Sequence, residues 1–328
     1  MDRKVSVLAV SALLAAGIIG FMLLRVWGDL LIAIGHWNPL YLLPAVAFST
    51  AGWWLRGARY RSILGRLGIR AGLAFSTACV LISQTANLIV PARLGDLVRI
   101  FILKHENMAG YPTGISSIVI ERFFDILTVA FLGLITLPFV LGVPAWVDYV
   151  IVLPIAACGA FVIALLAIGK LESENRILAI AFSMIHEIRK ASLSAGSMVI
   201  LSGLSVVIWL TDALTTASVA LMFHADIGFP VIVLAVVVGN LFKAIPVTPG
   251  GIGTYEAAVA VILVLGSSLT GAAGQATATL IAVSDHLVKN IITAVGGILS
   301  IWLLGGWVVD AIRDAFRGKE EMGGNDGD

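Results

Sequence analysis

Long apolar stretches recur along the whole chain, and they restrict its fold more than any other feature of the sequence. Several of them reach the roughly 20 apolar residues that a helix needs to cross the hydrocarbon core of a bilayer. The 328 residues are 59% hydrophobic and 12% charged, whereas about 25% of the residues of a soluble domain are charged. The sequence therefore predicts an all-α, polytopic integral membrane protein.

Six of the apolar stretches are predicted to be full spans: residues 5–24, 39–55, 113–141, 147–169, 195–223 and 277–309. The first follows MDRK, as a signal peptide would, but it is too long for a signal core, so we expect a retained helix. Residues 170–190 are amphipathic and are expected to lie on the cytoplasmic surface of the membrane. We expect residues 1–310 to form one membrane domain and the polar residues 311–328 to form a disordered cytoplasmic tail.

Arginines after the second apolar stretch indicate the orientation. The segment RGARYRSILGRLGIR, residues 56–70, contains five arginines and no acidic residue. Short basic loops remain in the cytoplasm, so this loop and both termini are predicted to be cytoplasmic. The protein itself is predicted to lie in the cell membrane. The basic residues that follow the stretch at 71–90 also stay on that side if the chain turns back at Pro91.

Two similar segments interrupt the apolar pattern: NLIVPARLGDLVR at residues 87–99 and NLFKAIPVTPGGIGTYE at residues 240–256. The first would enter the membrane from the cytoplasm, whereas the second would enter from outside and return through the short stretch 257–265. Two interrupted elements of opposite orientation predict an inverted repeat of two re-entrant, broken helical hairpins, whose breaks meet at a substrate site. The alternative is that proline and glycine merely kink two ordinary helices.

Arg93 follows the first break and is a candidate ligand for an anionic headgroup, because a guanidinium binds phosphate oxygens in a bidentate manner. Asp96 and Arg99 follow at helical spacing. In the alternative interpretation, the three charges form a local network and neutralise one another.

The second break places glycines at the start of a helix, where free backbone N–H groups attract phosphate or carboxylate. The candidate substrate-binding residues of this segment are Pro249, Gly250, Gly251, Gly253 and Glu256. Glu256 can also occupy the helix N-terminus itself. Lys243 precedes the break and can pair with Glu256.

Two further groups of charges fall within predicted spans. ERFFD carries Glu121, Arg122 and Asp125, and SDHLVKN carries Asp285, His286 and Lys289. An ionisable group inside a membrane costs about 2.5–3.5 kcal/mol on insertion scales, so such groups face the protein interior and pair. We expect the pairs Arg122–Asp125 and Asp285–Lys289. The same charges suit a hydrophilic path for a headgroup, and a proton relay through Glu121, Asp125 or His286 is a weaker alternative.

Other function classes find no support in the sequence. The formal net charge of +1 provides no basic field for nucleic acid. The histidines are scattered, and we expect no metal site, no cofactor and no enzymatic activity. Cys79 and Cys158 lie in apolar stretches, where packing is their simplest role.

The motifs PARLGDLVR, ERFFD and PVTPGGIGTYE resemble those of the lysylphosphatidylglycerol synthase transmembrane (flippase-like) family, and the resemblance covers nearly the whole chain. It highlights Arg93, Gly95, Arg99, Glu121, Arg122, Asp125, Pro249, Gly250, Gly251, Gly253 and Glu256. It implies a membrane lipid transporter that binds and translocates the headgroup of a phospholipid or polyprenyl-phosphate-type lipid. Relatives with a soluble synthase domain make aminoacylated lipids, but this sequence ends soon after its last apolar stretch, so lipid synthesis and a lysyl substrate are not expected.

The resemblance also implies partners. Membrane lipids with a phosphate-bearing headgroup are the expected ligands, and a glycosyltransferase or lipid-synthesis enzyme is a possible partner, because some relatives accompany glycosyltransferases that handle polyprenyl-phosphate sugars. Two alternative functions remain: a secondary transporter of a small solute, and a non-transporting membrane partner of a glycosyltransferase.

Overall fold

The computed structural model describes residues 37–90, 93–140, 142–168, 174–245, 248–305 and 307–308, together with the isolated residues 20, 21, 24 and 35. Within these ranges the chain forms ten α-helices and no strand, which confirms the all-α class. The predicted span at residues 5–24, apart from its isolated described positions, and the predicted tail at 311–328 lie outside the described residues.

Most of the described helices overlap the predicted apolar stretches, whereas the helix Asp96–His105 follows the first break and lies in none of them. The described helices are α3 (Leu42–Arg66), α4 (Leu73–Ile89), α5 (Asp96–His105), α6 (Tyr111–Thr136), α7 (Trp146–Ile168), α8 (Arg176–Ser192), α9 (Ala195–Met222), α10 (Phe229–Ala244), α11 (Thr254–Gly266) and α12 (Gly271–Leu304). The short 3-10 turns η1 (Pro39–Tyr41), η3 (Leu137–Phe139) and η4 (Pro249–Gly251) join some of them.

The end of α3 differs from the predicted end of the second span, and the difference changes the position of two arginines. The predicted basic loop at residues 56–70 is helical as far as Arg66, because α3 continues past the predicted end of the span at residue 55. Arg56 and Arg59 therefore lie in a helix, and Arg59 is only 1% exposed. Both form ion pairs with acidic side chains of other helices, which makes their burial possible. Only the last part of the predicted loop connects α3 to α4.

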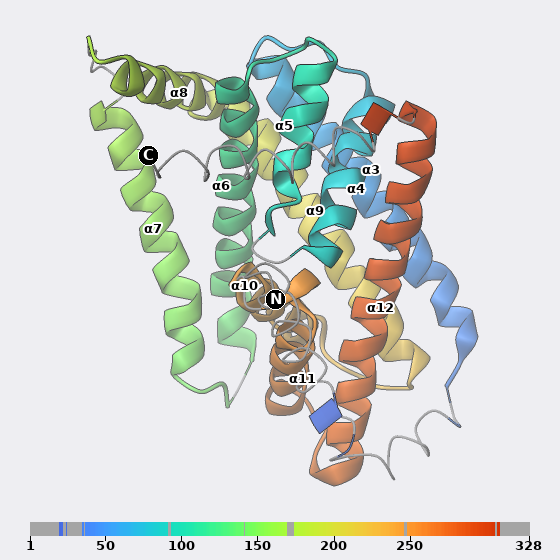
Figure 1. The fold of residues 1–328 in the computed structure, drawn as a ribbon. Helices are drawn as coiled ribbons and strands as arrows, with labels where there is room; N and C mark the ends of the chain where they lie inside the picture. The colour runs from blue at the N-terminus through green and yellow to red at the C-terminus, as the bar shows by residue number, and fades with distance from the viewer. Residues whose placement is uncertain are drawn as a thin grey trace, which may run out of the picture.

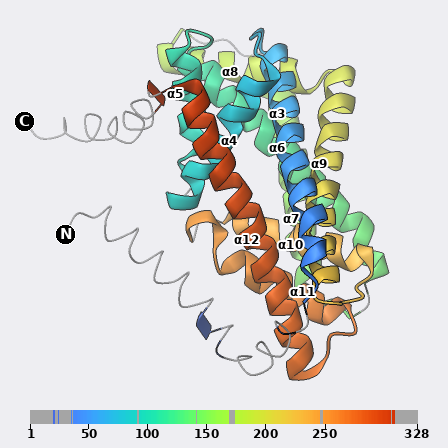
Figure 2. The same cartoon turned by 90° about the vertical axis from the view of Figure 1, so that its right-hand side faces the viewer.

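Two short helical hairpins occupy the middle of the bundle (Figures 1 and 2). α4 and α5 enter and leave from the end where α8 lies, whereas α10 and α11 enter and leave from the opposite end. Their tips touch: a Cβ built on Gly250 would lie 3.3 Å from Leu88 Cδ2. The longer helices α3, α6, α9 and α12 run past both hairpins, and α8 lies across one end of the bundle (Figures 1 and 2).

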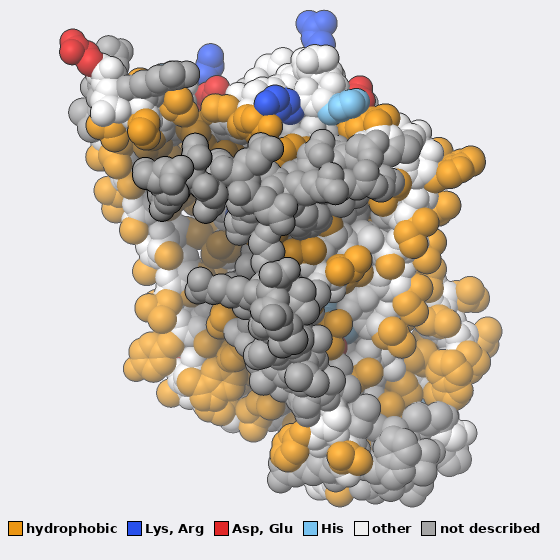
Figure 3. Space-filling view, viewed as in Figure 1, with side chains coloured by type: hydrophobic (Ala, Val, Ile, Leu, Met, Phe, Trp, Pro, Cys, Tyr) orange, Lys and Arg blue, Asp and Glu red, His pale blue; other side chains and the backbone are white. Residues whose placement is uncertain are grey.

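Four segments are long and apolar enough to cross a membrane by length and composition: Trp146–Ile168, Ala195–Met222, Pro249–Gly266 and Gly271–Leu304. The third joins η4 and α11 across a bend at Gly250, whose φ is 62°. α4 and α10 are apolar but shorter. Hydrophobic side chains cover much of the side of the molecule in Figure 3, and Trp302 on α12 is 79% exposed. These features are those of a multi-pass membrane protein.

Burial distinguishes the hairpin helices from the peripheral ones. In α10 every residue from Val231 to Gly239 is buried, and most of these residues pack with residues of α11 in the largest hydrophobic cluster. A helix that is apolar all round and buried belongs in the interior of a bundle. By contrast, Leu153 and Ile163 of α7 are exposed. Cys79 and Cys158 are buried free thiols, as expected for packing residues.

The space around two helical glycines, Gly57 and Gly203, predicts opposite effects for their changes to alanine. A Cβ on Gly57 of α3 would lie 1.9 Å from Thr77 Oγ1 and 2.8 Å from Thr77 Cα, whereas a Cβ on Gly203 of α9 would meet nothing within 4 Å. Gly57→Ala should therefore destabilise the protein by about 1–3 kcal/mol, and Gly203→Ala should stabilise it by up to about 1 kcal/mol. Thermal unfolding in detergent measures both. Equal midpoints for the two variants would contradict close packing at Gly57.

Candidate functional site

A polar cavity lies where the tips of the two hairpins approach each other. Its empty space, including the part open to solvent, is about 750 Å³. Cationic side chains on its wall outnumber carboxylates: the cations are Arg56, Arg59, Arg93, Arg122, Lys243 and Lys289, and the carboxylates are Glu121, Asp125 and Asp212. Ser49, Trp53, Val80, Gln84, Trp209, Asn240, Tyr255 and His286 complete the wall. The cavity is therefore suited to an anionic group.

Three arginines and three carboxylates form the arginine cluster on one side of the cavity. Its members are Arg59 of α3, Asp96 and Arg99 of α5, and Glu121, Arg122 and Asp125 of α6. Arg59 binds Asp125 at 2.7 Å, and Arg99 binds Glu121. The predicted pair Arg122–Asp125 is confirmed at 3.2 Å. Equal numbers of opposite charges make this cluster neutral, which is how a protein interior holds ionised groups.

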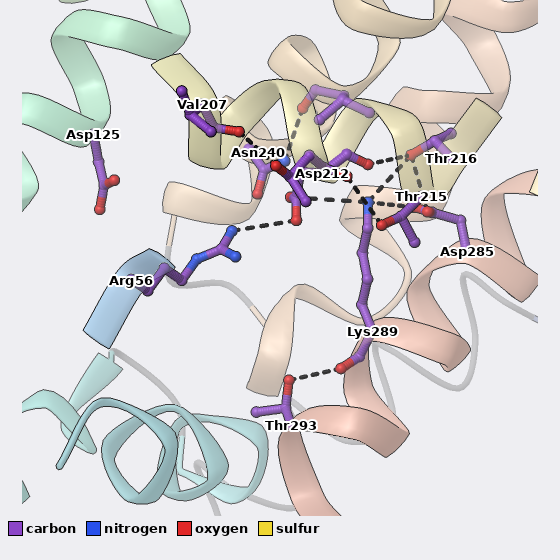
Figure 4. Close-up of polar contacts among 12 residues, drawn as sticks. Arg56, Asp125, Val207, Asp212, Thr215, Thr216, Asn240, Asp285, Lys289 and Thr293 are labelled. Carbon is purple, nitrogen blue, oxygen red and sulfur yellow. Dashed lines mark hydrogen bonds and ion pairs between the residues drawn. The ribbon is translucent and has the colours of Figure 1, made fainter. Parts of the chain in front are cut away.

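A second neutral group, the lysine cluster, consists of Arg56, Asp212, Asp285 and Lys289 on α3, α9 and α12 (Figure 4). The predicted pair Asp285–Lys289 is confirmed at 2.9 Å. Asp212 lies between Arg56 at 3.2 Å and Lys289 at 3.8 Å. Thr216 and Tyr255 donate hydrogen bonds to Asp285, which is fully buried.

Lys243, His286 and Glu256 form the histidine bridge behind the second break. Lys243 Nζ lies 3.0 Å from His286 Nε2, and His286 Nδ1 lies 2.7 Å from Glu256 Oε1. Glu256 accepts a hydrogen bond from the Gly253 N–H at 2.7 Å, so its carboxylate occupies the N-terminus of α11, as one interpretation of the sequence expected. The direct pair Lys243–Glu256 does not form, because the imidazole of His286 lies between the two side chains.

Arg93 and Lys243 are the two cations of the cavity wall for which the described part of the chain provides no carboxylate partner, and Lys243 contacts the His286 ring instead. In the described part of the chain Arg93 has no carboxylate within ion-pair distance, and its one hydrogen bond is a 3.5 Å contact from Nη2 to the Lys243 carbonyl. Asp96, its predicted partner, instead binds Arg99 at 3.3 Å and Arg122 at 3.4 Å. Ser83 and Asn87 also donate to Asp96. Within the described residues, most Arg93 donors thus have no acceptor, and Arg93 does not pair with Asp96.

The charged residues repeat their spacing on α6 and α12, the long helices that follow the two hairpins. Glu121, Arg122 and Asp125 on α6 have the same spacing as Asp285, His286 and Lys289 on α12. Each set faces its own hairpin: Glu121 pairs with Arg99 of α5, and His286 pairs with Glu256 of α11. The two halves, α3–α6 and α9–α12, therefore share an order of elements and a placement of charge.

The candidate residues named in the sequence analysis fall into two sets, those that line the cavity and those that do not. Arg93, Glu121, Arg122, Asp125 and Lys243 line the cavity, whereas Arg99, Pro249, Gly250, Gly251, Gly253 and Glu256 are not among its lining residues. Arg99 is fully buried within the arginine cluster. The three glycines have positive φ values between 62° and 89°, a region that side chains with a Cβ rarely adopt, so they shape the break.

Several lining residues were missed by the sequence analysis. Asp212 is an acidic residue within the apolar stretch 195–223, and its position alone could have marked it as an interior group. Arg56 and Arg59 have the three-residue spacing of a continuing helix, but they were assigned to a loop. No feature of the sequence marked the aromatic lining residues Trp53, Trp209 and Tyr255 as part of a site, because aromatic residues in apolar helices are common in membrane proteins.

Comparison with known proteins places the chain in a family. Residues 8–297 match the family described as "Lysylphosphatidylglycerol synthase TM region". The chain is 32% identical over 331 aligned positions to "Glycosyltransferase AglD" of Haloferax volcanii, an alignment that covers 88% of this chain and 52% of AglD. It is 28% identical over 190 positions to "UPF0104 membrane protein MJ1078" of Methanocaldococcus jannaschii, covering 55% of this chain and 79% of that protein.

The chain thus spans about half the length of AglD. No solved structure is significantly similar to it. The family match extends over most of the described helices and includes both hairpins and every charged residue of the cavity wall. The protein belongs to the lysylphosphatidylglycerol synthase transmembrane family.

Proposed function

We propose that the protein binds the phosphate-bearing headgroup of a membrane lipid in the cavity and moves it between the two leaflets, while the lipid tails remain in the bilayer. The observation that carries this proposal is Arg93, a cation with free guanidinium donors and no carboxylate partner in the described chain, at the meeting point of two broken hairpins. A guanidinium in such a position matches a phosphate in charge and in hydrogen-bond geometry.

The arrangement of the hairpins supports alternating access. In this proposal the protein has about six full spans, and the hairpins α4–α5 and α10–α11 are re-entrant elements of inverted orientation. α11 has 13 residues and is about 20 Å long at 1.5 Å per residue. A full crossing needs about 30 Å, and the longer segment Pro249–Gly266 that contains α11 is bent at Gly250. Transporters with inverted repeats bind substrate where their broken helices meet, and the cavity occupies that place here.

A second function is favoured by one comparison. AglD carries the name glycosyltransferase, and the chain aligns with about half of it. On that ground, the second candidate function is that of a membrane partner of a glycosyltransferase that does not itself transport lipid. We assign no catalytic step to the cavity in either function, and we place the protein in the cell membrane.

Reconstitution separates the two functions. The full chain is incorporated into phosphatidylcholine vesicles that contain fluorescently labelled phosphatidylglycerol in both leaflets, and a membrane-impermeant reductant is added outside. Lipid translocation predicts that the reductant bleaches nearly all of the fluorescence, whereas protein-free vesicles lose about half. Loss of only half in vesicles with folded protein would contradict translocation of this lipid and favour the partner function.

Cysteine labelling tests the re-entrant arrangement. In a variant without Cys79 and Cys158, single cysteines at the exposed residues Arg70, Glu106 and Ser268 would be treated with an impermeant maleimide in intact cells. Positions 70 and 106 flank the hairpin α4–α5, so both should be protected on the cytoplasmic side, and position 268 should react. Reaction at position 106 but not at position 70 would show that this hairpin crosses the membrane.

A further inference from the structure

Each carboxylate of the cavity wall already pairs with at least two cations of the protein. Glu121 and Asp125 each bind at least two arginines of the arginine cluster, and Asp212 is held by Arg56 and Lys289. An ammonium group entering the cavity would have to displace one of these cations. It would then leave a buried positive charge without a partner, which is strongly unfavourable.

The aromatic faces of the cavity are also occupied. The Arg56 guanidinium lies 5.0 Å from the centre of the Trp53 ring and 5.8 Å from that of Trp209. Lys243 and Lys289 each lie 5.7 Å from the centre of the Tyr255 ring. Cation–π contacts are the usual alternative to carboxylates for holding an ammonium. Here the protein's own cations already make them.

Hydrogen-bond donors, by contrast, are in excess. Arg93 uses one of its donors in a single long contact, and the Trp209 Nε1–H is buried without a partner in the described chain. Among the residues that the structure describes, the His286 ring nitrogen is the one hydrogen-bonding group that Lys243 Nζ contacts. A buried donor without an acceptor is costly, so the cavity favours a ligand that supplies acceptor oxygens and negative charge.

We infer that the ligand of this cavity is a phosphate ester whose polar part carries no ammonium group, and that the cavity discriminates against aminoacylated, cationic headgroups. The inference rests on the proposed function for the statement that the phosphate belongs to a lipid. It separates this chain from the lysyl lipid in the name of its family. The free phosphate oxygens would accept from Arg93 and Lys243.

A matched pair of lipids tests the inference by binding rather than by transport. Dioctanoyl phosphatidylglycerol and dioctanoyl lysyl-phosphatidylglycerol differ only in the lysyl group, and their affinities for the purified full chain in detergent are measured by thermal shift and by tryptophan fluorescence. We expect the lysyl lipid to bind about tenfold more weakly or worse, because like charges brought together inside a site are strongly unfavourable. Equal or tighter binding of the lysyl lipid would overturn the inference.

A soluble probe keeps the inference separate from the proposed function. If sn-glycerol 3-phosphate binds as well as dioctanoyl phosphatidylglycerol, and the lysyl lipid still binds weakly, the phosphate specificity holds and the lipid assignment fails. If only the lipid binds, both stand. If the lysyl lipid and the uncharged dioctanoylglycerol bind as well as phosphatidylglycerol, the phosphate specificity fails whatever the transport assay shows.

Reversing the charge at Arg93 gives the most direct test of the lipid preference. Arg93→Glu should invert the preference, so that lysyl-phosphatidylglycerol binds more tightly than phosphatidylglycerol, because the unpaired charge then has the opposite sign. Arg70→Glu, on the exposed loop after α3, is the matched control and should keep the wild-type preference. If Arg93→Glu does not fold, Arg93→Gln should bring the two affinities together. A folded Arg93→Gln variant with unchanged discrimination would overturn the role of Arg93.

Discussion

Arg93→Gln should lower headgroup translocation by about 10- to 100-fold without destabilising the protein. Hydrogen bonds to charged groups contribute about 1.5–3 kcal/mol, and each 1.4 kcal/mol is a factor of 10. Stability should be preserved because Arg93 has no carboxylate partner in the described chain. The measurement is translocation of labelled phosphatidylglycerol in vesicles at matched protein levels, combined with thermal unfolding in detergent.

Two further variants distinguish a phosphate ligand from a structural charge. Arg93→Lys should also be impaired, because an ammonium lacks the planar pair of donors. The double variant Arg93→Ala with Asp96→Ala should not restore transport, since Asp96 is paired with Arg99 and Arg122 rather than with Arg93. Arg70→Gln, an exposed arginine, is the control. Recovery in the double variant would assign Arg93 to the arginine cluster and remove it from the binding site.

Arg99→Met should cause the largest loss of stability among the charged positions, about 3–5 kcal/mol, because removing one partner of a buried ion pair leaves the other charge uncompensated. Arg99 is fully buried and binds both Asp96 and Glu121. Methionine keeps much of the volume, so packing contributes little to the expected loss. Thermal and denaturant unfolding of the detergent-solubilised protein measure the effect.

The same position tests whether Arg99 touches the ligand. Adding Glu121→Gln to Arg99→Met should recover part of the stability, because one uncompensated carboxylate is then removed. Arg61→Met, on the exposed side of α3, should change stability by less than about 0.5 kcal/mol. If Arg99→Met instead retained full stability and lost only transport, Arg99 would belong to the binding site, as the sequence motif suggests, and the arginine cluster would not be a structural unit.

Helix positions could be predicted well from the sequence. The stretch predicted at 195–223 is α9 (Ala195–Met222), and that predicted at 147–169 is α7 (Trp146–Ile168). Long apolar stretches locate such helices because the backbone in a bilayer must satisfy its own hydrogen bonds over a fixed thickness. The breaks were equally visible, since proline and clustered glycines interrupt a helix for local steric reasons.

Short-range ion pairs were also predictable. Arg122–Asp125 and Asp285–Lys289 are three and four residues apart on one helix, where side chains are neighbours whatever the rest of the fold does. The capping of α11 by Glu256 follows from the same local geometry. Each of these contacts depends on spacing along a single element.

Which charge would remain without a partner was decided by the tertiary structure alone. Sequence spacing suggested that Asp96 pairs with Arg93, but in the structure Asp96 pairs with Arg122 of α6. Sequence spacing also suggested the pair Lys243–Glu256, but His286 of α12 lies between these two side chains. Arg59 and Asp125 pair across 66 positions of the chain. A sequence alone determines which residues carry charge and which stretches are helical, because those properties are local. The pairing of buried charges depends on distances between helices, and among the described residues these distances leave Arg93 without a carboxylate partner at the meeting point of the two hairpins.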